Sequence, residues 1–540
     1  MRLPAGKRPL PANKEVQLQD SFFRVLPGLP ATEAECALCF MEGLATIYRY
    51  LDVPPVSWFD WEAIAKRTVR DLARSKECLR RIDGVTYLNA YVGSIEKPPE
   101  SMVQGAVLVP LIEYEAWLGK PLALLKVLGH NQTKFYDKKL HSIVRWLPGS
   151  RFDKEKLSDE EVAGRMDSWY LIHTLMNLGR QAELGRDPER KIFRDSLDYV
   201  IRLARHFKHD WPVFFDGQTL LVHKLETEEG SGGERDVPGL YIHLMMQAWE
   251  MEKDGRYLAE AEDAAASLVG LRFGVLYQTN NTALTAMGLA RLWQQTGNAL
   301  YRELSYVCIG SILSHLWLWE SGDPARRWET FMGLPPLHDC PYIAAYEEGE
   351  IFAVFSAYLT VLGREVPDCI AHLLAEYGKR LLHRGRYYFP SELPPDAVCL
   401  KPKDGIMRPA LAIPVEDLYP SSEVAGQVGQ EVYGAALALI LTARIYRRWK
   451  EIPCDVWSDA PLFDAEFSIP ERQLRLRVGG MPHQEFSIRL ICRKARARMN
   501  PVLRMILKEG TRGRKCRPLV NPEKHTLYRI RGSSWLCIEW

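Results

Sequence analysis

The chain has 540 residues, a length typical of three or four domains or of one large helical domain with a smaller neighbour. Its 70 Lys and Arg residues nearly balance 68 Asp and Glu residues, and the net charge is +2. This balance excludes a protein that coats a polyanion through its overall charge. The hydrophobic fraction of 47% and the charged fraction of 26% are typical of a folded globular protein and exclude disorder over most of the chain.

The N-terminal segment, residues 1–25, carries Pro4, Pro9 and Pro11 among charged side chains and builds no apolar run of the kind a secretory signal needs. Later apolar stretches such as 435–443 are shorter than the roughly 20 residues that span a bilayer. We therefore expect a cytoplasmic protein without a membrane-spanning segment.

The 11 cysteines are too sparse for a disulfide-stapled secreted domain, so we expect reduced thiols. Cys36 and Cys39 form one CxxC motif, but the surrounding periodicity is helical and no second pair follows to complete a zinc site. Motifs such as GxGxxG, GxxxxGK[ST], HExxH and GxSxG are also absent from the sequence. We expect no metal and no cofactor.

Helical periodicity of apolar residues continues through almost all of the chain up to Trp449. The predicted helices cover 31–51, 61–81, 103–117, 120–129, 166–183, 188–208, 236–253, 257–269, 279–296, 299–320, 344–362, 366–383 and 430–449. They form about six helical hairpins followed by one closing helix.

The connections between these helices fall into two classes. Short segments containing Gly185, Gly255, Gly297 or Gly363 join the two helices of a hairpin, so the paired helices are antiparallel. The connections between hairpins are long and cover 82–102, 145–165, 209–235, 270–278, 321–343 and 384–429. Because such connections all emerge on one side of a hairpin array, we expect function on that face.

The pattern changes after Trp449. Alternating apolar residues at Leu474, Leu476 and Val478 predict a strand, and 486–492 and 526–540 predict further strands. We therefore predict an N-terminal extension over 1–30, a helical domain over 31–450 and a small β-rich domain over 451–540.

Positive charge is concentrated in the β-rich domain. The segment 489–531 holds 14 Lys or Arg residues and two acids. Such a segment can bind a nucleic acid or another polyanion, or it can be a solvated edge. We favour the solvated edge and expect no nucleic-acid partner, although the charge leaves one open.

Hairpins in series with long loops on one side, together with a β-rich tail, resemble the (α/α) toroids of the six-hairpin glycosidase-like superfamily. The segments 243–265 (HLMMQAWEMEKDGRYLAEAEDAA) and 281–305 (NTALTAMGLARLWQQTGNALYRELS) carry this resemblance, which is architectural and covers about 31–450. It implies a mainly α fold, a barrel of inner and outer helices with a carbohydrate cleft across one end. Glycoside hydrolases, uronyl hydrolases and polysaccharide lyases share that layout, so the fold does not choose among them.

The densest group of reactive side chains lies in 337–350 (LHDCPYIAAYEEGE), at the end of a long loop and the start of a helix. Tyr342, Tyr346 and Glu350 are spaced four apart and share one helix face. The candidate catalytic residues here are His338, Asp339, Tyr346, Glu347 and Glu348, with Tyr342 as a binding residue. Glycoside hydrolysis needs two carboxyl groups, although acids also gather at helix starts to complement the macrodipole.

Three other helix starts carry candidates. Arg165, Asp167, Trp169 and Tyr170 open one helix, where Asp167 is a catalytic acid or an N-cap and Trp169 is a stacking platform or core. Asp236, Tyr241 and His243 belong to the next inner helix, where Asp236 has the position of an ordinary N-cap. Asn280 and Asn281 open a third helix, and one of the two amides is surplus to capping.

The loop residues Arg326 and Trp328 have the side chains that would bind a uronate by guanidinium pairing and stacking, or they are plain surface residues. The leading hypothesis is a glycoside hydrolase that cleaves oligosaccharides with acidic sugars by means of paired carboxylates. The first alternative is a polysaccharide lyase that uses Tyr and His, with an Asn to neutralise the uronate carboxylate.

The second alternative is a non-catalytic helical-repeat scaffold that binds a partner. A fixed repeat period is typical of a scaffold, but the four hairpin glycines are 70, 42 and 66 residues apart, which disfavours it. The lack of an export signal favours the trimming of imported oligosaccharides.

Overall fold

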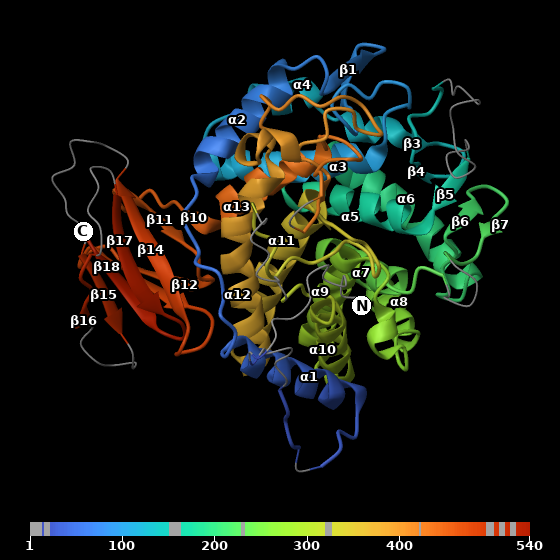
Figure 1. Cartoon of the computed structure of the whole chain (residues 1–540). Helices are drawn as coiled ribbons and strands as arrows, with labels where there is room; N and C mark the ends of the chain where they lie inside the picture. The colour runs from blue at the N-terminus through green and yellow to red at the C-terminus, as the bar shows by residue number, and fades with distance from the viewer. Residues whose placement is uncertain are drawn as a thin grey trace.

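The computed structural model describes residues 13, 15, 22–26, 28–150, 164–227, 233–318, 327–420, 423–492, 502–506, 514–518 and 525–540. The helices are α1 (Glu33–Tyr48), α2 (Trp61–Arg74), α3 (Ser101–Leu118), α4 (Ala123–Leu128), α5 (Ser168–Glu183), α6 (Asp187–His206), α7 (Val237–Glu252), α8 (Gly255–Ala266), α9 (Thr279–Thr296), α10 (Ala299–Leu313), α11 (Ala345–Leu362), α12 (Asp368–Arg384) and α13 (Ala436–Ile445). Figure 1 shows them gathered into one body beside a separate group of strands.

Six of the described helices form a closed inner ring. Contacts join α3 to α5, α5 to α7, α7 to α9, α9 to α11, α11 to α13 and α13 back to α3. The remaining helices cover the ring from outside, with α4, α6, α8, α10 and α12 each packed on the inner helix that precedes it. This arrangement confirms the predicted (α/α) toroid, and its closure is unlike the open stack of a helical-repeat scaffold.

The sequence explains which helices lie inside. Helices α7 and α9 bury residues around their whole circumference, because neighbours surround them on every side. Helix α6, by contrast, has a strongly amphipathic sequence and buries one face, as expected for an outer helix.

The first two helices do not pack together as one of the six sequential hairpins that the sequence predicts. Helix α1 packs against α10 and α12, whereas α2 packs against α13 and α4, so both lie on the outside. The outer partner of α13 is therefore supplied by the opposite end of the domain's sequence.

The helix predicted over 61–81 is wrong beyond Arg74. Residues 79–88 form a β-hairpin of β1 (Leu79–Ile82) and β2 (Val85–Leu88). Asp83 and Gly84 between them both have positive φ, 48° and 80°, and Asp-Gly is a strong hairpin signal. The helix predicted over 430–449 is likewise shortened, because residues 446–447 leave it and pair with a strand.

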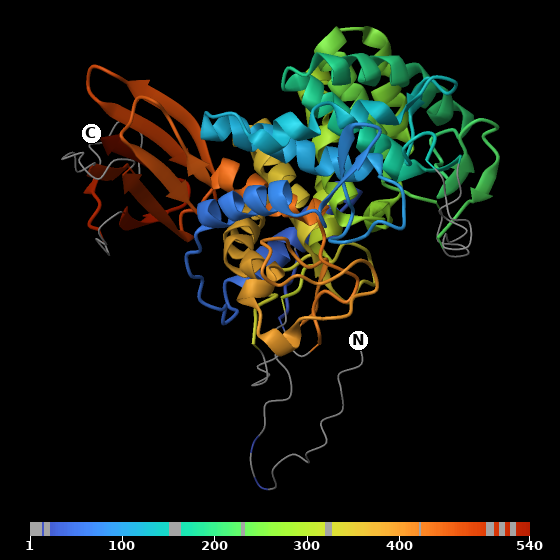
Figure 2. The same cartoon turned by 90° about the horizontal axis from the view of Figure 1, so that it is seen from above.

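The other strands are β3 (Tyr136–Asp137), β4 (Ser142–Ile143), β5 (Arg165–Asp167), β6 (Phe214–Asp216), β7 (Val222–Lys224), β8 (Ile343–Ala344), β9 (Asp417–Leu418), β10 (Tyr446–Arg447), β11 (Cys454–Ser458), β12 (Leu462–Ser468), β13 (Gln473–Val478), β14 (Glu485–Cys492), β15 (Val502–Ile506), β16 (Arg514–Lys515), β17 (His525–Arg531) and β18 (Trp535–Glu539). The strands from β10 onward form two antiparallel sheets, β10-β11-β14-β17 and β12-β13-β18-β15-β16. Figure 2 shows this β-sandwich at one side of the helical body.

The sandwich confirms the β-rich C-terminal part and its first predicted strand, since Leu474, Leu476 and Val478 lie on β13 and are buried. Their faces pack against Ile488 and Leu490 of the other sheet. Much of the basic segment 489–531 lies outside the described residues. No helix in the described ranges is long and apolar enough to cross a membrane.

The long connections meet at the N-terminal ends of the inner helices. Strand β8, directly before α11, pairs with β9 from the connection between α12 and α13. Isolated bridges also join Tyr91 to Glu431 and Gln278 to Leu337. These pairings hold loops from distant parts of the chain over one end of the ring, which is the face predicted to carry function.

The close approach of α7 and α9 provides a test of the ring packing. A Cβ atom on Gly288 of α9 would lie 2.8 Å from the backbone N and 2.9 Å from the Cα of His243. We expect Gly288→Ala to lower the free energy of unfolding by about 1–3 kcal/mol because α7 and α9 must separate. Urea denaturation followed by circular dichroism measures this change.

The matched control is Gly43→Ala in the interior of the outer helix α1, where no atom lies within 4 Å of the added Cβ. This substitution should raise the free energy of unfolding by about 0.5–1 kcal/mol through the lower entropy of the unfolded chain. Equal stability of the two variants would contradict the close packing of α7 on α9.

Candidate active site

A buried polar group at the axis of the ring centres on the Glu350 carboxylate of α11. His173 Nε2 of α5 lies 2.9 and 3.1 Å from its two oxygens, and the Tyr346 hydroxyl donates to Oε1 at 2.7 Å. The Asn280 amide of α9 donates to Oε2 at 2.7 Å. Three inner helices thus contribute to one constellation, which we call the Glu350 group (His173, Asn280, Tyr346 and Glu350).

The surroundings of Glu350 favour its ionised form. Burial by itself would raise the pKa of this carboxyl, but His173, Asn280 and Tyr346 outweigh burial, so the pKa lies below its usual range. Burial and the nearby Glu350 charge raise the pKa of Tyr346, which stays a neutral hydrogen-bond donor. The centre of the ring therefore holds a carboxylate that is available as a base or nucleophile.

The orientation of His173 is set from its other ring nitrogen. The Asn177 side-chain amide lies 3.3 Å from His173 Nδ1. The Asn177 amide and the Glu350 carboxylate therefore contact the two ring nitrogens of His173 from opposite sides and fix the plane of the ring. Asn177 is therefore a positioning residue for the Glu350 group.

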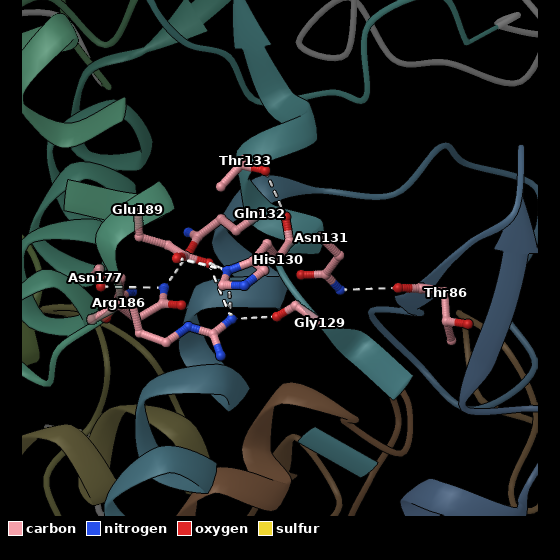
Figure 3. Close-up of polar contacts among 10 residues, drawn as sticks. Thr86, Gly129, His130, Asn131, Gln132, Thr133, Asn177, Arg186 and Glu189 are labelled. Atoms are coloured by element: carbon pink, nitrogen blue, oxygen red, sulfur yellow. Dashed lines mark hydrogen bonds and ion pairs between the residues drawn. The ribbon is translucent and has the colours of Figure 1, made fainter. Parts of the chain in front are cut away.

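A polar network behind Asn177 supports this part of α5 (Figure 3). Gln181 donates to the Asn177 carbonyl at 3.3 Å and also to Gln132, whose amide donates to the Ser101 carbonyl at 3.2 Å. Next to Gln132, His130 Nδ1 contacts Glu189 of α6 at 2.9 Å. The network joins α5 to the start of α3. The helical turn that carries His173 is therefore held in place by contacts to a second inner helix.

A second set of carboxyl groups, which we call the acid cluster (Glu347, Glu416 and Glu431), lies beside the Glu350 group. Burial, with a smaller contribution from neighbouring carboxylates, raises the pKa of Glu347 to about 8 and that of Glu416 to about 7. The pKa of Glu431 is raised well above its ordinary value by burial and by Glu347 and Glu416. At neutral pH this cluster therefore holds protons that a substrate oxygen can accept.

Aromatic rings border both sets of carboxyl groups. Trp169 lies 4.4 Å from Tyr170 and 5.7 Å from His173, between ring centroids. On the other side, Tyr433 lies 5.3 Å from Tyr346 and 6.2 Å from Tyr91. We call Trp169, Tyr170, Tyr433 and Tyr91 the aromatic belt; all four are partly exposed, and such rings suit stacking on sugar faces.

The structure brings five of the sequence-predicted residues to this place: Tyr346, Glu347, Asn280, Trp169 and Tyr170. Tyr342 lies at its edge, with its ring 5.6 Å from that of Tyr419. Asn281 follows Asn280 on α9 and is buried, and its side-chain amide donates to the Gln278 side-chain oxygen at 3.4 Å.

Asp167 and Asp236 lie in a neighbouring buried group of three acids with Glu234. Asp167 is an N-cap, as predicted in one of its two interpretations, and accepts from the Tyr170 backbone N–H at 3.1 Å. Asp236 does not cap its own helix and instead accepts from the backbone N–H of Gln278 at 2.8 Å, which ties α7 to α9. Burial raises the pKa of Asp236 to about 7.

Glu348 points away from the axis. Its carboxylate pairs with Arg384 of α12 and also accepts from the hydroxyls of Tyr377 and Tyr388 and from the Leu334 backbone N–H. Both partners of the ion pair are fully buried. These bonds engage both oxygens of the Glu348 carboxylate and join α11 to α12. Glu348 therefore has a structural role in place of the predicted catalytic one.

Other predicted residues are also placed elsewhere. Tyr241 faces outward and donates to Glu260 of α8 at 2.8 Å, and the buried Trp328 donates to the Tyr419 carbonyl at 2.8 Å. The side chains of His338 and Asp339 are 68% and 93% exposed and pair with each other at 2.8 Å. They lie in a loop away from the Glu350 group, so their predicted catalytic roles find no partner there.

Arg165 lies on β5 beside a different cavity, next to Trp146 and Gly217. His243 lies deeper along the ring axis, on the far side of the Glu350 group from the loops. Arg326 lies outside the described residues.

Four residues of the site were not among the predicted site residues: His173, Glu350, Glu416 and Glu431. A signal existed for Glu350, because Tyr346 and Glu350 are four apart on one helix face. Glu416 and Glu431 lie in a long irregular connection with no periodicity, so their convergence could not be read from the sequence.

Cys36 and Cys39 lie on α1, as predicted, and neither takes part in a disulfide. Within the described part of the chain, no group of three or more His, Cys, Asp or Glu side chains is arranged to hold a metal ion.

No protein-family model and no curated protein sequence matches the chain. Among solved structures, it is similar to a D-mannose isomerase, with a TM-score of 0.44, 11% identity and coverage of 73% of this chain and 100% of that one. It is also similar to a sugar epimerase from a ruminal bacterium, with a TM-score of 0.45, 10% identity and coverage of 71% and 99%. A third similarity is to a family 76 glycoside hydrolase from a bovine Bacteroides thetaiotaomicron strain, with a TM-score of 0.44, 11% identity and coverage of 71% and 77%.

The different positions of Glu347 and Glu348 predict different effects on stability. Glu348→Gln leaves Arg384 buried without its counter-charge, so we expect the free energy of unfolding to fall by about 3–5 kcal/mol. Glu347→Gln is the matched control, because it replaces a carboxyl that is mostly protonated at pH 7 and should stay near the stability of the unsubstituted protein. Urea denaturation at pH 7 compares the two, and equal stability would contradict the structural role of Glu348.

Proposed function

We propose that the protein is a carbohydrate-active enzyme that hydrolyses a glycosidic bond, with Glu347 as the general acid and Glu350 as the general base or nucleophile. The observation that carries this proposal is the opposite pKa shifts of two carboxyl groups three residues apart on α11. Glycoside hydrolysis requires one protonated and one ionised carboxyl at the same bond. Because their surroundings differ, Glu347 is mostly protonated and Glu350 is ionised at neutral pH.

The proposed reaction uses each neighbouring group in a definite way. A glycan stacked on the aromatic belt presents its glycosidic oxygen to Glu347, which donates a proton to the departing sugar. Glu350 then accepts a proton from the water that attacks the anomeric carbon, or attacks that carbon itself to form a glycosyl ester, which water hydrolyses with Glu347 as the base. His173, Asn280 and Tyr346 hold Glu350 and keep it ionised until it reacts.

The groups at the loop end of the ring axis, beside the aromatic belt, favour a neutral sugar over an acidic one. Beside the aromatic belt, the Arg145 guanidinium lies 4.3 Å from the Tyr170 ring centroid and is paired with Glu100 at 3.4 Å. Trp328, which was expected to bind a uronate, is buried and bonded to a backbone carbonyl. We therefore expect neutral oligosaccharides to be cleaved faster than those ending in a uronate.

Removal of either carboxyl tests the proposal. Glu350→Gln and Glu347→Gln should each lower kcat by about 100-fold or more, since a positioned acid or base contributes about that much. The assay measures new reducing ends from a panel of neutral and acidic oligosaccharides, with circular dichroism to confirm that the variants are folded. Asp263→Asn on the exposed face of α8 is the control and should retain full activity.

The pH dependence of the reaction tests the assignment of roles. Glu347 must be protonated, so kcat/KM should fall as the pH rises through about 8, the pKa of this group. Glu350 must be ionised, and because its pKa is lowered, activity should persist into mildly acidic solution. Glu347→Gln should remove the alkaline limb from the residual activity, whereas an unchanged limb would assign that limb to another group.

One observation favours β-elimination as a second candidate function. Tyr346 Oη lies 3.2 Å from His173 Nε2, and Asn280 is next to them, so the residue types of a polysaccharide lyase are together. A lyase would release an unsaturated uronate that absorbs in the ultraviolet and would lose its activity in Tyr346→Phe. Hydrolysis gives reducing ends without this absorbance and should be more sensitive to Glu347→Gln than to Tyr346→Phe.

A further inference from the structure

A cavity runs along the ring axis on the side of the Glu350 group opposite to the loops. Its volume is about 210 Å³, and its floor is formed by His173, Tyr346 and Glu350. Its walls come from the inner helices, where Met176, Leu284 and Met287 are among the apolar residues. The cavity is large enough for a small organic molecule and is bounded on all sides by the rigid inner ring.

The polarity of this cavity changes from floor to rim. The floor carries the ionised Glu350, whereas Arg180, Arg291 and Arg444 lie toward the C-terminal ends of α5, α9 and α13. The side chain of Arg180 is 41% exposed, whereas those of His173 and Glu350 are 1% and 16% exposed, so the rim is more open to solvent than the floor. An anionic group of a ligand is therefore favoured at the rim and disfavoured at the floor.

Two of the rim arginines are already neutralised. Glu113 contacts Arg180 at 2.8 Å and Arg444 at 2.7 Å, and Arg180 also contacts Glu183 at 2.8 Å. Burial alone would raise the pKa of Glu113, but both arginines lower it and keep the carboxylate ionised. On this side of the rim, the charges of Arg180 and Arg444 are therefore balanced within the protein.

Arg291 differs from the other two. Its acidic neighbour Glu250 lies 3.7 Å from Nη1, too far for a hydrogen bond, and Nη1 is buried without a hydrogen-bond partner among the described residues. Burial also raises the pKa of Glu250, although Arg291 lowers it in part. Arg291 therefore presents a guanidinium whose charge is poorly compensated.

Neutral polar groups lie between Arg291 and the floor. His243 Nδ1 and Gln247 Oε1 are also buried and lack a hydrogen-bond partner within the part of the chain that the structure describes. Burial, Arg291 and Arg180 lower the pKa of His243 well below its ordinary value, so its ring is neutral. A guanidinium, an imidazole and an amide thus face one cavity whose walls are apolar, a combination that suits a hydroxylated organic anion.

We propose that this axial cavity is a second ligand site, in which Arg291 binds the carboxylate of a small hydroxy acid such as a sugar acid. His243 and Gln247 bind its hydroxyls, and the apolar walls pack on its carbon skeleton. The site shares its floor with the Glu350 group, and it goes beyond the proposed hydrolysis because its lining includes no residue of the aromatic belt or the acid cluster. The ligand contacts the floor with its uncharged end.

Binding of D-glucuronate to the full-length protein tests this site. The chain is labelled with ¹³C-methyl methionine, and the Met176 and Met287 signals are assigned from Met176→Leu and Met287→Leu. Glucuronate should shift these two signals in a saturable way, and glucose, which has no carboxylate, should not. Arg291→Gln should raise the Kd for glucuronate by about tenfold or more, Arg291→Lys should restore part of the affinity, and Arg256→Gln on the outer helix α8 should change nothing.

The proposal is overturned if glucuronate leaves both methionine signals unchanged in the unsubstituted protein, or if Arg291→Gln binds it as tightly. Equal binding of glucose would also overturn it, because the carboxylate would then play no part. The experiment reads binding and not turnover, so its failure says nothing against hydrolysis by Glu347 and Glu350. Conversely, if the protein cleaves no oligosaccharide but glucuronate shifts the two methionine signals, the axial site is supported and the proposed hydrolysis is not.

Discussion

Closure of the inner helical ring is the constraint on which the rest of this structure depends. The inner helices are apolar on nearly all sides, and each can bury that surface only between two neighbours and an outer layer. When α13 packs between α11 and α3, the last inner helix meets the first and the surface is fully covered. The same packing brings residues 173, 280 and 350 to one axis, although they are far apart in the sequence.

Helix α11 shows how this geometry distributes chemistry among adjacent residues. Glu347, Glu348 and Glu350 are close in the sequence, but the helical rotation directs them to different surroundings. Glu348 points outward and joins α11 to α12 through Arg384, while Glu350 points to the axis and is held ionised. Glu347 lies among other carboxyl groups and keeps its proton to about pH 8. The structural carboxyl and the proposed reactive carboxyls thus lie on the same helix, and they differ only in the direction in which their side chains leave it.

The axis also has two chemically different ends. At the loop end, the acid cluster and aromatic rings surround the Glu350 group with protonated carboxyls and stacking surfaces. At the other end, arginines surround a cavity with apolar walls. The Glu350 group separates these ends, and the long connections cover only the first. A closed ring therefore offers two sites where an open helical stack would offer one continuous surface.

The sequence by itself determined the helical elements, the short turns within hairpins, the strands after Trp449 and the face that carries the long loops, because these follow from local periodicity. It also indicated Tyr346, Glu347 and Asn280, since each lies near the start of an inner helix. It did not distinguish Glu348 from Glu350, because the two directions differ only with respect to the ring axis. Only the tertiary structure placed His173 against Glu350, and Glu416 and Glu431 beside Glu347. Those contacts join segments whose approach depends on ring closure, and no local pattern in the sequence records which segments will meet.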